Sequence, residues 1–152
     1  AFAPTRVYDE NNILIKHFEG KRQGFLDLKD IGNIPCSFHP FIIRNKQKKF
    51  EEIRSQDVYN TACILNEHNT KISTINGGYY KLNLQRKSVT KEDGFSHKIN
   101  LAYIKYQIKS IRNKNLKIAR MFAIRRINNI KYINWKKNND KSFYEYLNEK
   151  EN

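Results

Sequence analysis

A stretch of 46 residues between Asp93 and Asp140 contains neither aspartate nor glutamate, although it carries twelve of the chain's 29 lysines and arginines. The other 17 basic residues nearly balance the 15 acidic ones, so this stretch accounts for almost all of the formal net charge of +14. A block of like charge repels itself unless a polyanion neutralises it. The missing acids therefore predict an anionic partner for this segment.

Long apolar runs and cysteines are scarce as well. The longest uncharged run, 31–43, has 13 residues and includes Pro35 and Pro40, whereas a membrane-spanning helix needs about 20 apolar residues. The sequence therefore predicts no transmembrane span. Only two cysteines are present, which excludes a disulfide framework and favours a reducing compartment.

The short motifs of common enzyme classes are also missing. There is no glycine-rich dinucleotide or phosphate loop, no Gly-x-Ser-x-Gly elbow and no His-Glu-x-x-His zinc motif. Acidic pairs such as Asp9-Glu10, and Asp27 with Asp30, lie near lysine or arginine, where a surface ion pair is the ordinary role. We therefore expect a noncatalytic protein without a cofactor.

Two Cys-His pairs, Cys36 with His39 and Cys63 with His68, consist of residue types that bind tetrahedral zinc. Cys63, however, falls inside a predicted helix, on an apolar face where a buried cysteine is the usual interpretation. A metal site is therefore not favoured, and these four residues are only the set that a zinc ion would use.

The pattern of apolar residues predicts a mostly helical α+β fold in four parts. Residues 1–48 have little periodicity and several glycines and prolines, which predicts an extended arm lying on a partner; an ordinary loop-rich segment is the alternative. Residues 49–96 are predicted to form a helix over 49–68 and a β-hairpin over 71–85. The hairpin is predicted because Asn76-Gly77 separates two β-favouring runs.

The third part, 97–139, is predicted to be a long basic helix over 97–127 followed by a looser linker. Its apolar residues recur within an arc of about 100° when each residue advances by 100°. This apolar arc consists of Leu101, Ile104, Ile108, Ile111, Ile118 and Phe122. A separate basic arc of roughly 80° consists of Lys98, Lys105, Lys109, Arg112 and Arg120. The last part, 140–152, is a short helix that begins with the capping box Ser142-Phe143-Tyr144-Glu145.

Aromatic residues alternate with the cations of the third part. Cations neutralise phosphates and aromatic rings stack on unpaired bases, so the combination is typical of RNA binding. The predicted RNA contacts are Lys98, Lys105, Lys109, Arg112, Lys117, Arg120, Arg125, Arg126, Tyr103, Tyr106 and Trp135. The alternatives are a solvated basic face with aromatics in the core, an acidic protein partner and an anionic lipid surface.

Composition points to an AT-rich genome such as that of a protist or an organelle, because Lys, Asn and Ile number 20, 19 and 19 against six Ala and six Gly. The chain begins with Ala1, which removal of a targeting leader would explain, as would a fragment that starts late.

We therefore expect a noncatalytic structural component of a mitochondrial ribonucleoprotein in the matrix, specifically a ribosomal protein that contacts ribosomal RNA and neighbouring ribosomal proteins. The alternative is a lineage-specific accessory subunit of an inner-membrane respiratory or ATP synthase complex, with its cations on anionic lipid.

Overall fold

The computed structural model describes residues 4–18, 25–33, 55–69, 71–73, 78–84, 94–139 and 141–151. Its helices are α1 (Leu28–Asn33), α2 (Gln56–Glu67), α3 (Phe95–Arg112), α4 (Leu116–Lys136) and α5 (Phe143–Glu151). Its strands are β1 (Thr5–Tyr8), β2 (Leu14–Phe18), β3 (Phe25–Leu26), β4 (Ile72–Ser73) and β5 (Tyr80–Asn83). The predicted class, a mostly helical α+β fold, is confirmed.

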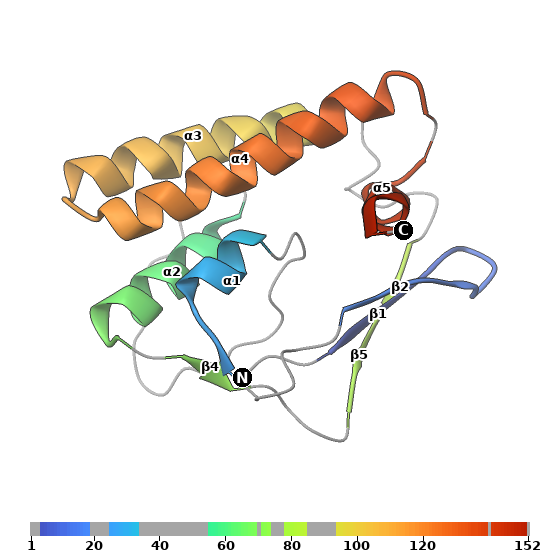
Figure 1. Cartoon of the computed structure of the whole chain (residues 1–152), viewed down its shortest axis with the longest axis horizontal. Helices are drawn as coiled ribbons and strands as arrows, with labels where there is room; N and C mark the ends of the chain where they lie inside the picture. The colour runs from blue at the N-terminus through green and yellow to red at the C-terminus, as the bar shows by residue number, and fades with distance from the viewer. Residues whose placement is uncertain are drawn as a thin grey trace.

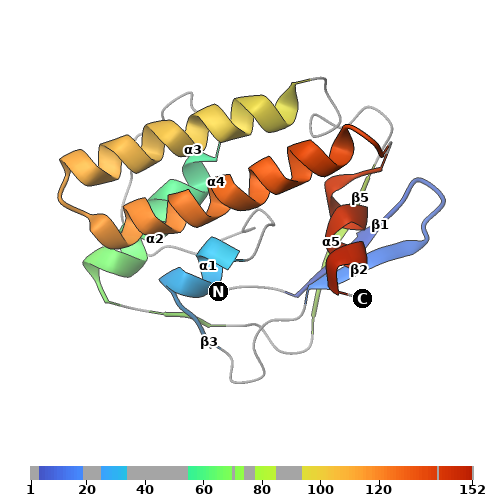
Figure 2. The same cartoon turned by 45° about the horizontal axis from the view of Figure 1, so that its top comes forward.

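Helices α3 and α4 lie side by side and run in opposite directions (Figure 1, Figure 2). The single long helix predicted over 97–127 is therefore wrong. The chain turns at residues 113–115, where Lys114 has a φ of 55° and the backbone N–H of Asn115 donates to the carbonyl of Ser110 at 2.8 Å. A residue in the left-handed region cannot continue a right-handed helix, so α3 ends and α4 begins at this turn.

The looser linker predicted to follow residue 127 is largely helical, because α4 continues to Lys136. Asn129 lies within α4 and donates an Nδ2 hydrogen to the carbonyl oxygen of Ser96 at 2.8 Å. Nη1 of Arg126 donates to Oε1 of Gln107 at 3.3 Å. Both hydrogen bonds join α3 to α4, so they help to hold the helical hairpin together.

Replacing Lys114 with glycine should stabilise this turn. We expect the free energy of unfolding to rise by about 0.5–1 kcal/mol, because glycine adopts a positive φ without the steric penalty of a Cβ. A matched variant, Lys117→Gly, removes a neighbouring cation from a helical position and should lower the free energy by about 1 kcal/mol. Urea denaturation measures both changes. A Lys114→Gly protein less stable than the wild type would contradict the left-handed turn.

Helices α1 and α2 lie against the α3–α4 hairpin and complete the hydrophobic core (Figure 1). Phe122 is fully buried, and its ring centroid lies 5.3 Å from that of Tyr106 and 5.8 Å from that of Tyr103. Tyr59 of α2 stacks on Tyr106 with 4.6 Å between the ring centroids. Four aromatic rings from three helices therefore form the centre of the core.

Glycine is needed where α1 meets α4. A Cβ added to Gly32 would lie only 3.3 Å from Cγ of Met121, which is closer than two carbon atoms ordinarily pack. The neighbouring Ile31 is fully buried in the same core. The absence of a side chain at position 32 therefore favours the close approach of α1 to α4.

A three-stranded sheet in the order β2–β1–β5 lies on the side of the molecule where α4 ends (Figure 1). β1 pairs with β2 in antiparallel and with β5 in parallel orientation, so Thr5 lies opposite both Phe18 and Tyr80. Val7 at the centre of the sheet is fully buried. The described residues of the predicted arm, 4–18 and 25–33, therefore pair and pack with other parts of the chain. The rest of the arm lies outside the described residues.

The β-hairpin predicted over 71–85 is wrong for the described strands. β4 pairs with β3 in a separate two-stranded sheet, whereas β5 pairs with β1. Asn76-Gly77, on which the prediction rested, lies outside the described residues. Pairing with strands from the first 26 residues has outweighed local turn chemistry. Of the helix predicted over 49–68, α2 accounts for the described residues from Gln56 onward.

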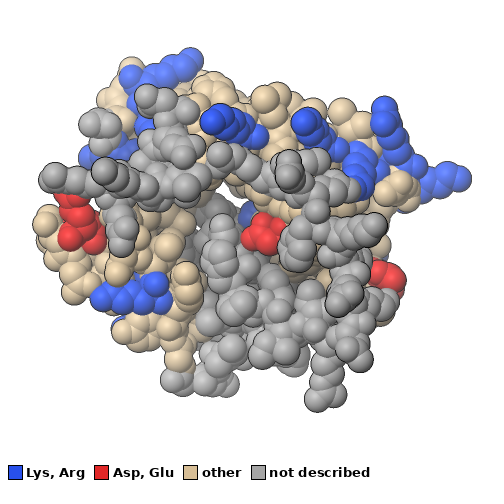
Figure 3. Space-filling model, turned by 180° about the vertical axis from the view of Figure 1, so that it is seen from behind, with Lys and Arg blue, Asp and Glu red and all other residues tan. Residues whose placement is uncertain are grey.

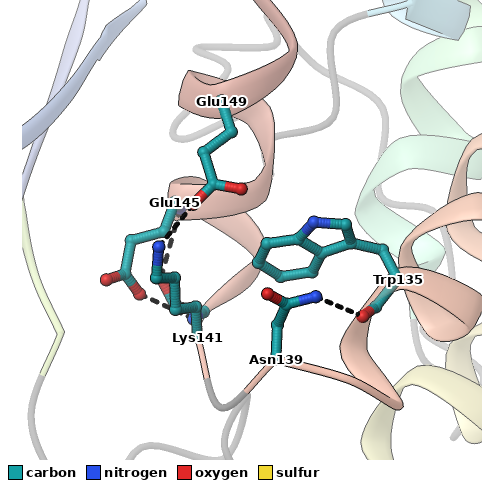
Figure 4. Close-up of polar contacts among 6 residues, drawn as sticks. Trp135, Asn139, Lys141, Glu145 and Glu149 are labelled. Atoms are coloured by element: carbon teal, nitrogen blue, oxygen red, sulfur yellow. Dashed lines mark hydrogen bonds and ion pairs between the residues drawn. The ribbon is translucent and has the colours of Figure 1, made fainter.

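The capping box at the start of α5 is confirmed. The backbone N–H of Ser142 donates to Oε2 of Glu145 at 2.6 Å, and the N–H of Glu145 donates to Oγ of Ser142 at 3.3 Å. Lys141 and Glu149 form an ion pair at 2.5 Å beside this box (Figure 4). These contacts define where the C-terminal helix begins.

Aromatic rings join α5 to the end of α4. The ring of Tyr132 meets that of Phe143 edge-on at 4.8 Å, and the ring of Trp135 lies 5.1 Å from that of Tyr146. The indole of Trp135 lies toward α5, while its carbonyl accepts a hydrogen bond from Asn139 at 2.8 Å (Figure 4). The C-terminal helix is thus docked by a second, smaller aromatic cluster.

Stability should fall at high pH because of Tyr132. Burial, reinforced by the negative charge of Glu145, raises the pKa of this phenol to about 12 from 10.0. The neutral phenol therefore stabilises the fold fully below pH about 10, and this contribution is lost as the pH rises from about 10 through 12. Thermal melts across this range should show a steeper loss for the wild type than for Tyr132→Phe. Parallel curves would contradict the role of this phenol.

Candidate nucleic-acid interface

Exposed cations cover the α3–α4 hairpin. Nine of the twelve lysines and arginines in the acid-free segment are exposed, and none of these nine has an ion pair with a described residue. They are Lys98, Lys105, Arg112, Lys114, Lys117, Arg120, Lys131, Lys136 and Lys137. Figure 3 shows lysine and arginine side chains spread along the upper edge of the molecule, while the carboxylates visible on that face lie lower. The hairpin therefore presents positive charge to the solvent without compensation from its own acids.

Three of the predicted RNA-binding cations are engaged within the fold. Arg125 is buried, with its guanidinium 5.8 Å from the ring centroid of Tyr103. Nζ of Lys109 lies 5.2 Å from the ring centroid of Tyr59. Arg126 is half-buried and bonded to Gln107. The remaining predicted cations, Lys98, Lys105, Arg112, Lys117 and Arg120, are exposed.

Two of the three aromatic residues of the predicted interface, Tyr103 and Tyr106, are buried. Tyr106 is 1% exposed and stacks on Tyr59, and Tyr103 is buried against Phe122. Neither ring can stack on a base without unfolding the core. Trp135 is half-buried in the cluster that docks α5. The aromatics interleaved with the cations therefore serve packing, which is the alternative that the sequence left open.

The predicted apolar arc divides between two sides of the hairpin. Ile118 and Phe122 are buried in the core. Leu101, Ile108 and Ile111, in contrast, are 59%, 45% and 51% exposed. The turn at 113–115 explains the difference, because it resets the helical register and separates positions that one continuous helix would have kept on one face. The buried residues of α3 are instead Ala102, Tyr103, Tyr106 and Ser110.

A second basic surface, missed by the sequence analysis, lies on the three-stranded sheet. Register places Arg6 directly opposite Lys81 on the neighbouring strand. The guanidinium of Arg6 lies 4.1 Å from the ring centroid of Tyr79, and Nζ of Lys81 lies 4.6 Å from that of Tyr8. Neither cation has a carboxylate partner among the described residues. This surface therefore contains both cations and aromatic rings. They lie close together because β1 pairs with β5, which is distant in the sequence.

The acidic residues Asp9, Asp27 and Asp30 accept hydrogen bonds from the backbone and so stabilise local turns of the fold. Oδ1 of Asp9 accepts hydrogen bonds from the backbone N–H groups of Asn11 and Ile13 in the β1–β2 turn, at 2.9 and 2.7 Å. Asp27 and Asp30 exchange backbone-to-carboxylate hydrogen bonds of 2.9 Å at the start of α1. Within the described residues, no group of three or more His, Cys, Asp or Glu is arranged to hold a metal ion.

The zinc set is only partly described. Cys63 lies in α2 and packs against the core, and His68 follows the end of that helix. Cys36 and His39 lie outside the described residues. The structure therefore gives the positions of Cys63 and His68 only. A zinc site made of all four residues stays a hypothesis from the sequence.

No protein-family model, curated protein or solved structure matches this chain. None of the helices in the described ranges is long and apolar enough to cross a membrane. The function must therefore be argued from the surfaces of the molecule.

Proposed function

We propose that this protein is a noncatalytic structural component of a mitochondrial ribonucleoprotein, namely a ribosomal protein whose helical hairpin binds the phosphate backbone of ribosomal RNA. The proposal rests on one observation: nine exposed cations on α3, on α4, in the turn between them and at the residue after α4 lack an ion pair within the described chain. Contact with phosphates relieves their mutual repulsion and releases the counterions that RNA would otherwise hold.

The outer side of α4 offers the most continuous set of phosphate contacts. Lys117, Arg120 and Lys131 are exposed there and lie within about 60° of one another around the helix axis at 100° per residue. Lys114, in the turn that precedes α4, is exposed as well. An RNA strand lying along this side of α4 would therefore meet cations near the start of the helix and again at Lys131.

Recognition on the hairpin should concern the RNA backbone and not its bases. Tyr103 and Tyr106 are buried, so the hairpin offers cations without an exposed ring beside them. Phosphate contacts position a protein on RNA but carry no sequence information. Among the described residues, the aromatic rings that are exposed enough to stack on a base are those of Tyr79 and Tyr80 at the sheet, which are 49% and 38% exposed.

Sedimentation of the native complex with and without ribonuclease tests the proposal. We expect the protein to migrate with a large particle and to shift to a smaller one after ribonuclease treatment. The recombinant chain should bind RNA of unrelated sequences with similar affinity, and this affinity should decrease steeply as salt increases. Unchanged migration after ribonuclease would overturn the ribosomal proposal.

One observation favours the inner-membrane alternative. Exposed aliphatic residues lie beside the cations of the hairpin, a combination that also suits an anionic lipid surface. An accessory subunit of this kind should sediment with phosphatidylcholine vesicles that contain cardiolipin, and ribonuclease should not change its native migration. The two treatments therefore separate the two candidate functions.

A further inference from the structure

No described helix or strand lies against the side of α3 that faces away from α2 and α4 (Figure 2). Exposed residues of α3 form an aliphatic row. This row, which we name the outer seam, consists of Leu101, Ile104, Ile108 and Ile111. Leu101, Ile108 and Ile111 are about half exposed, and Ile104 is half-buried. At 100° per residue the outer seam lies roughly opposite the core-facing residues of α3. It is thus an apolar face that no described element of the fold packs against.

The spacing of the outer seam is that of a coiled coil. Its residues are separated by three, four and three positions, which is the a–d–a–d pattern of two heptads. In that register Lys98, Lys105 and Arg112 all occupy e positions, seven residues apart. The e positions flank a coiled-coil interface and select partners by charge.

We propose that the outer seam docks an amphipathic α-helix of another protein, with apolar residues at its own a and d positions and glutamate or aspartate beside them. The carboxylates would pair with Lys98, Lys105 and Arg112, which are exposed and lack ion pairs among the described residues. This inference goes beyond the proposed function, because it concerns a protein partner and not RNA.

The neighbouring helix α4 also carries exposed aliphatic residues. Ile127 and Ile130 are 49% and 39% exposed, and Ala123 lies one turn before Ile127. A small side chain next to larger ones leaves a groove on the helix surface, and the side chains of a docked helix can pack into such a groove. The partner helix would therefore contact both members of the hairpin.

Charge and composition argue against the other occupants. A second copy of this chain would bring two acid-free basic flanks together, and like charges across an interface oppose association. An RNA backbone would not be bound by four aliphatic side chains, because phosphates bind cations and hydrogen-bond donors. A bilayer interface favours exposed Trp, Tyr and Phe, whereas every aromatic residue of α3 and α4 is buried or half-buried. An acid-flanked protein helix fits all of these features.

The test uses a labelled synthetic peptide of about three heptads with leucine and isoleucine at a and d and glutamate at e and g. Fluorescence anisotropy should show binding to the full chain. The variant Leu101→Ser/Ile108→Ser/Ile111→Ser should bind at least about tenfold more weakly. Because these side chains are about half exposed and lie outside the core, the variant should remain folded, which circular dichroism and a thermal melt check. Ile13→Ser/Leu14→Ser, which changes exposed aliphatic residues of the β1–β2 hairpin, is the matched control and should bind like the wild type.

Further peptides and vesicles decide between the possible occupants. A peptide with lysine at e and g, and a scrambled glutamate peptide without an apolar face, should both fail to bind. Undiminished binding of the glutamate peptide by the seam variant, or no binding to the wild type, would overturn the proposal. So would seam-dependent binding to phosphatidylcholine–cardiolipin vesicles without peptide binding, or a seam-dependent dimer in sedimentation equilibrium. The seam variant should keep its RNA affinity, so failure of this inference is distinguishable from failure of the RNA proposal.

Discussion

A variant with glutamate at Lys117, Arg120 and Lys131 should lose at least about a hundredfold in RNA affinity near physiological salt, since each lost phosphate contact removes its share of counterion release. All three side chains are exposed on α4 and none has an ion pair with a described residue. Their reversal should therefore leave the fold intact while it replaces attraction by repulsion. Anisotropy titrations with a labelled single-stranded RNA at several salt concentrations measure the effect.

The matched control reverses three lysines outside the hairpin. Lys29, Lys71 and Lys150 are exposed, and their reversal lowers the net charge by the same amount. This control should lose far less affinity, because screening limits the reach of a charge to about 10 Å at 0.1 M salt. Equal losses in the two variants would show that only total charge matters, and the α4 interface would then be abandoned.

Replacing Phe122 with alanine should lower the free energy of unfolding by about 3–5 kcal/mol, as expected for truncation of a buried aromatic residue. The ring is fully buried and lies within 6.0 Å, centroid to centroid, of Tyr59, Tyr103 and Tyr106. Its loss would leave a cavity at the junction of three helices. A loss of this size is a large part of the roughly 5–15 kcal/mol that stabilises an ordinary domain, so a marginally stable chain would be partly unfolded.

Two comparisons make this measurement specific. Phe122→Leu keeps an apolar side chain in the cavity and should be clearly less destabilising than alanine. Leu116→Ala removes a side chain that is 69% exposed, so its effect should stay within about 0.5 kcal/mol. Urea denaturation followed by circular dichroism provides all three values. Similar losses for Phe122→Ala and Leu116→Ala would contradict the core described for this hairpin.

Features encoded by neighbouring residues were predictable from the sequence. The capping box of Ser142 and Glu145 needs only residues three positions apart, and its two hydrogen bonds are formed as expected. The basic character of the hairpin follows from residue counts alone. The turn at Lys114 was not predictable in this way, because lysine rarely adopts a positive φ and no glycine or proline marks the position.

Features that depend on distant residues were missed for a physical reason. Whether a tyrosine faces solvent or the core depends on where the neighbouring helices lie, and the burial of Tyr103 and Tyr106 follows from the packing of α2 and α4 on α3. The strand β4 pairs with β3 and the strand β5 pairs with β1, so both pair with strands from the first 26 residues and not with each other. The basic surface of Arg6 and Lys81 exists only through such a pairing.

The parallel pairing of β1 with β5 has a consequence for the order of folding. Thr5 and Tyr80 are 75 positions apart, so their pairing closes a long loop, and the entropy of that closure slows the step. The hairpin of α3 and α4 is joined by three residues and closes a short loop. We therefore expect helical signal to develop first during refolding, and protection of the β1 amides from hydrogen exchange to follow as the last kinetic phase.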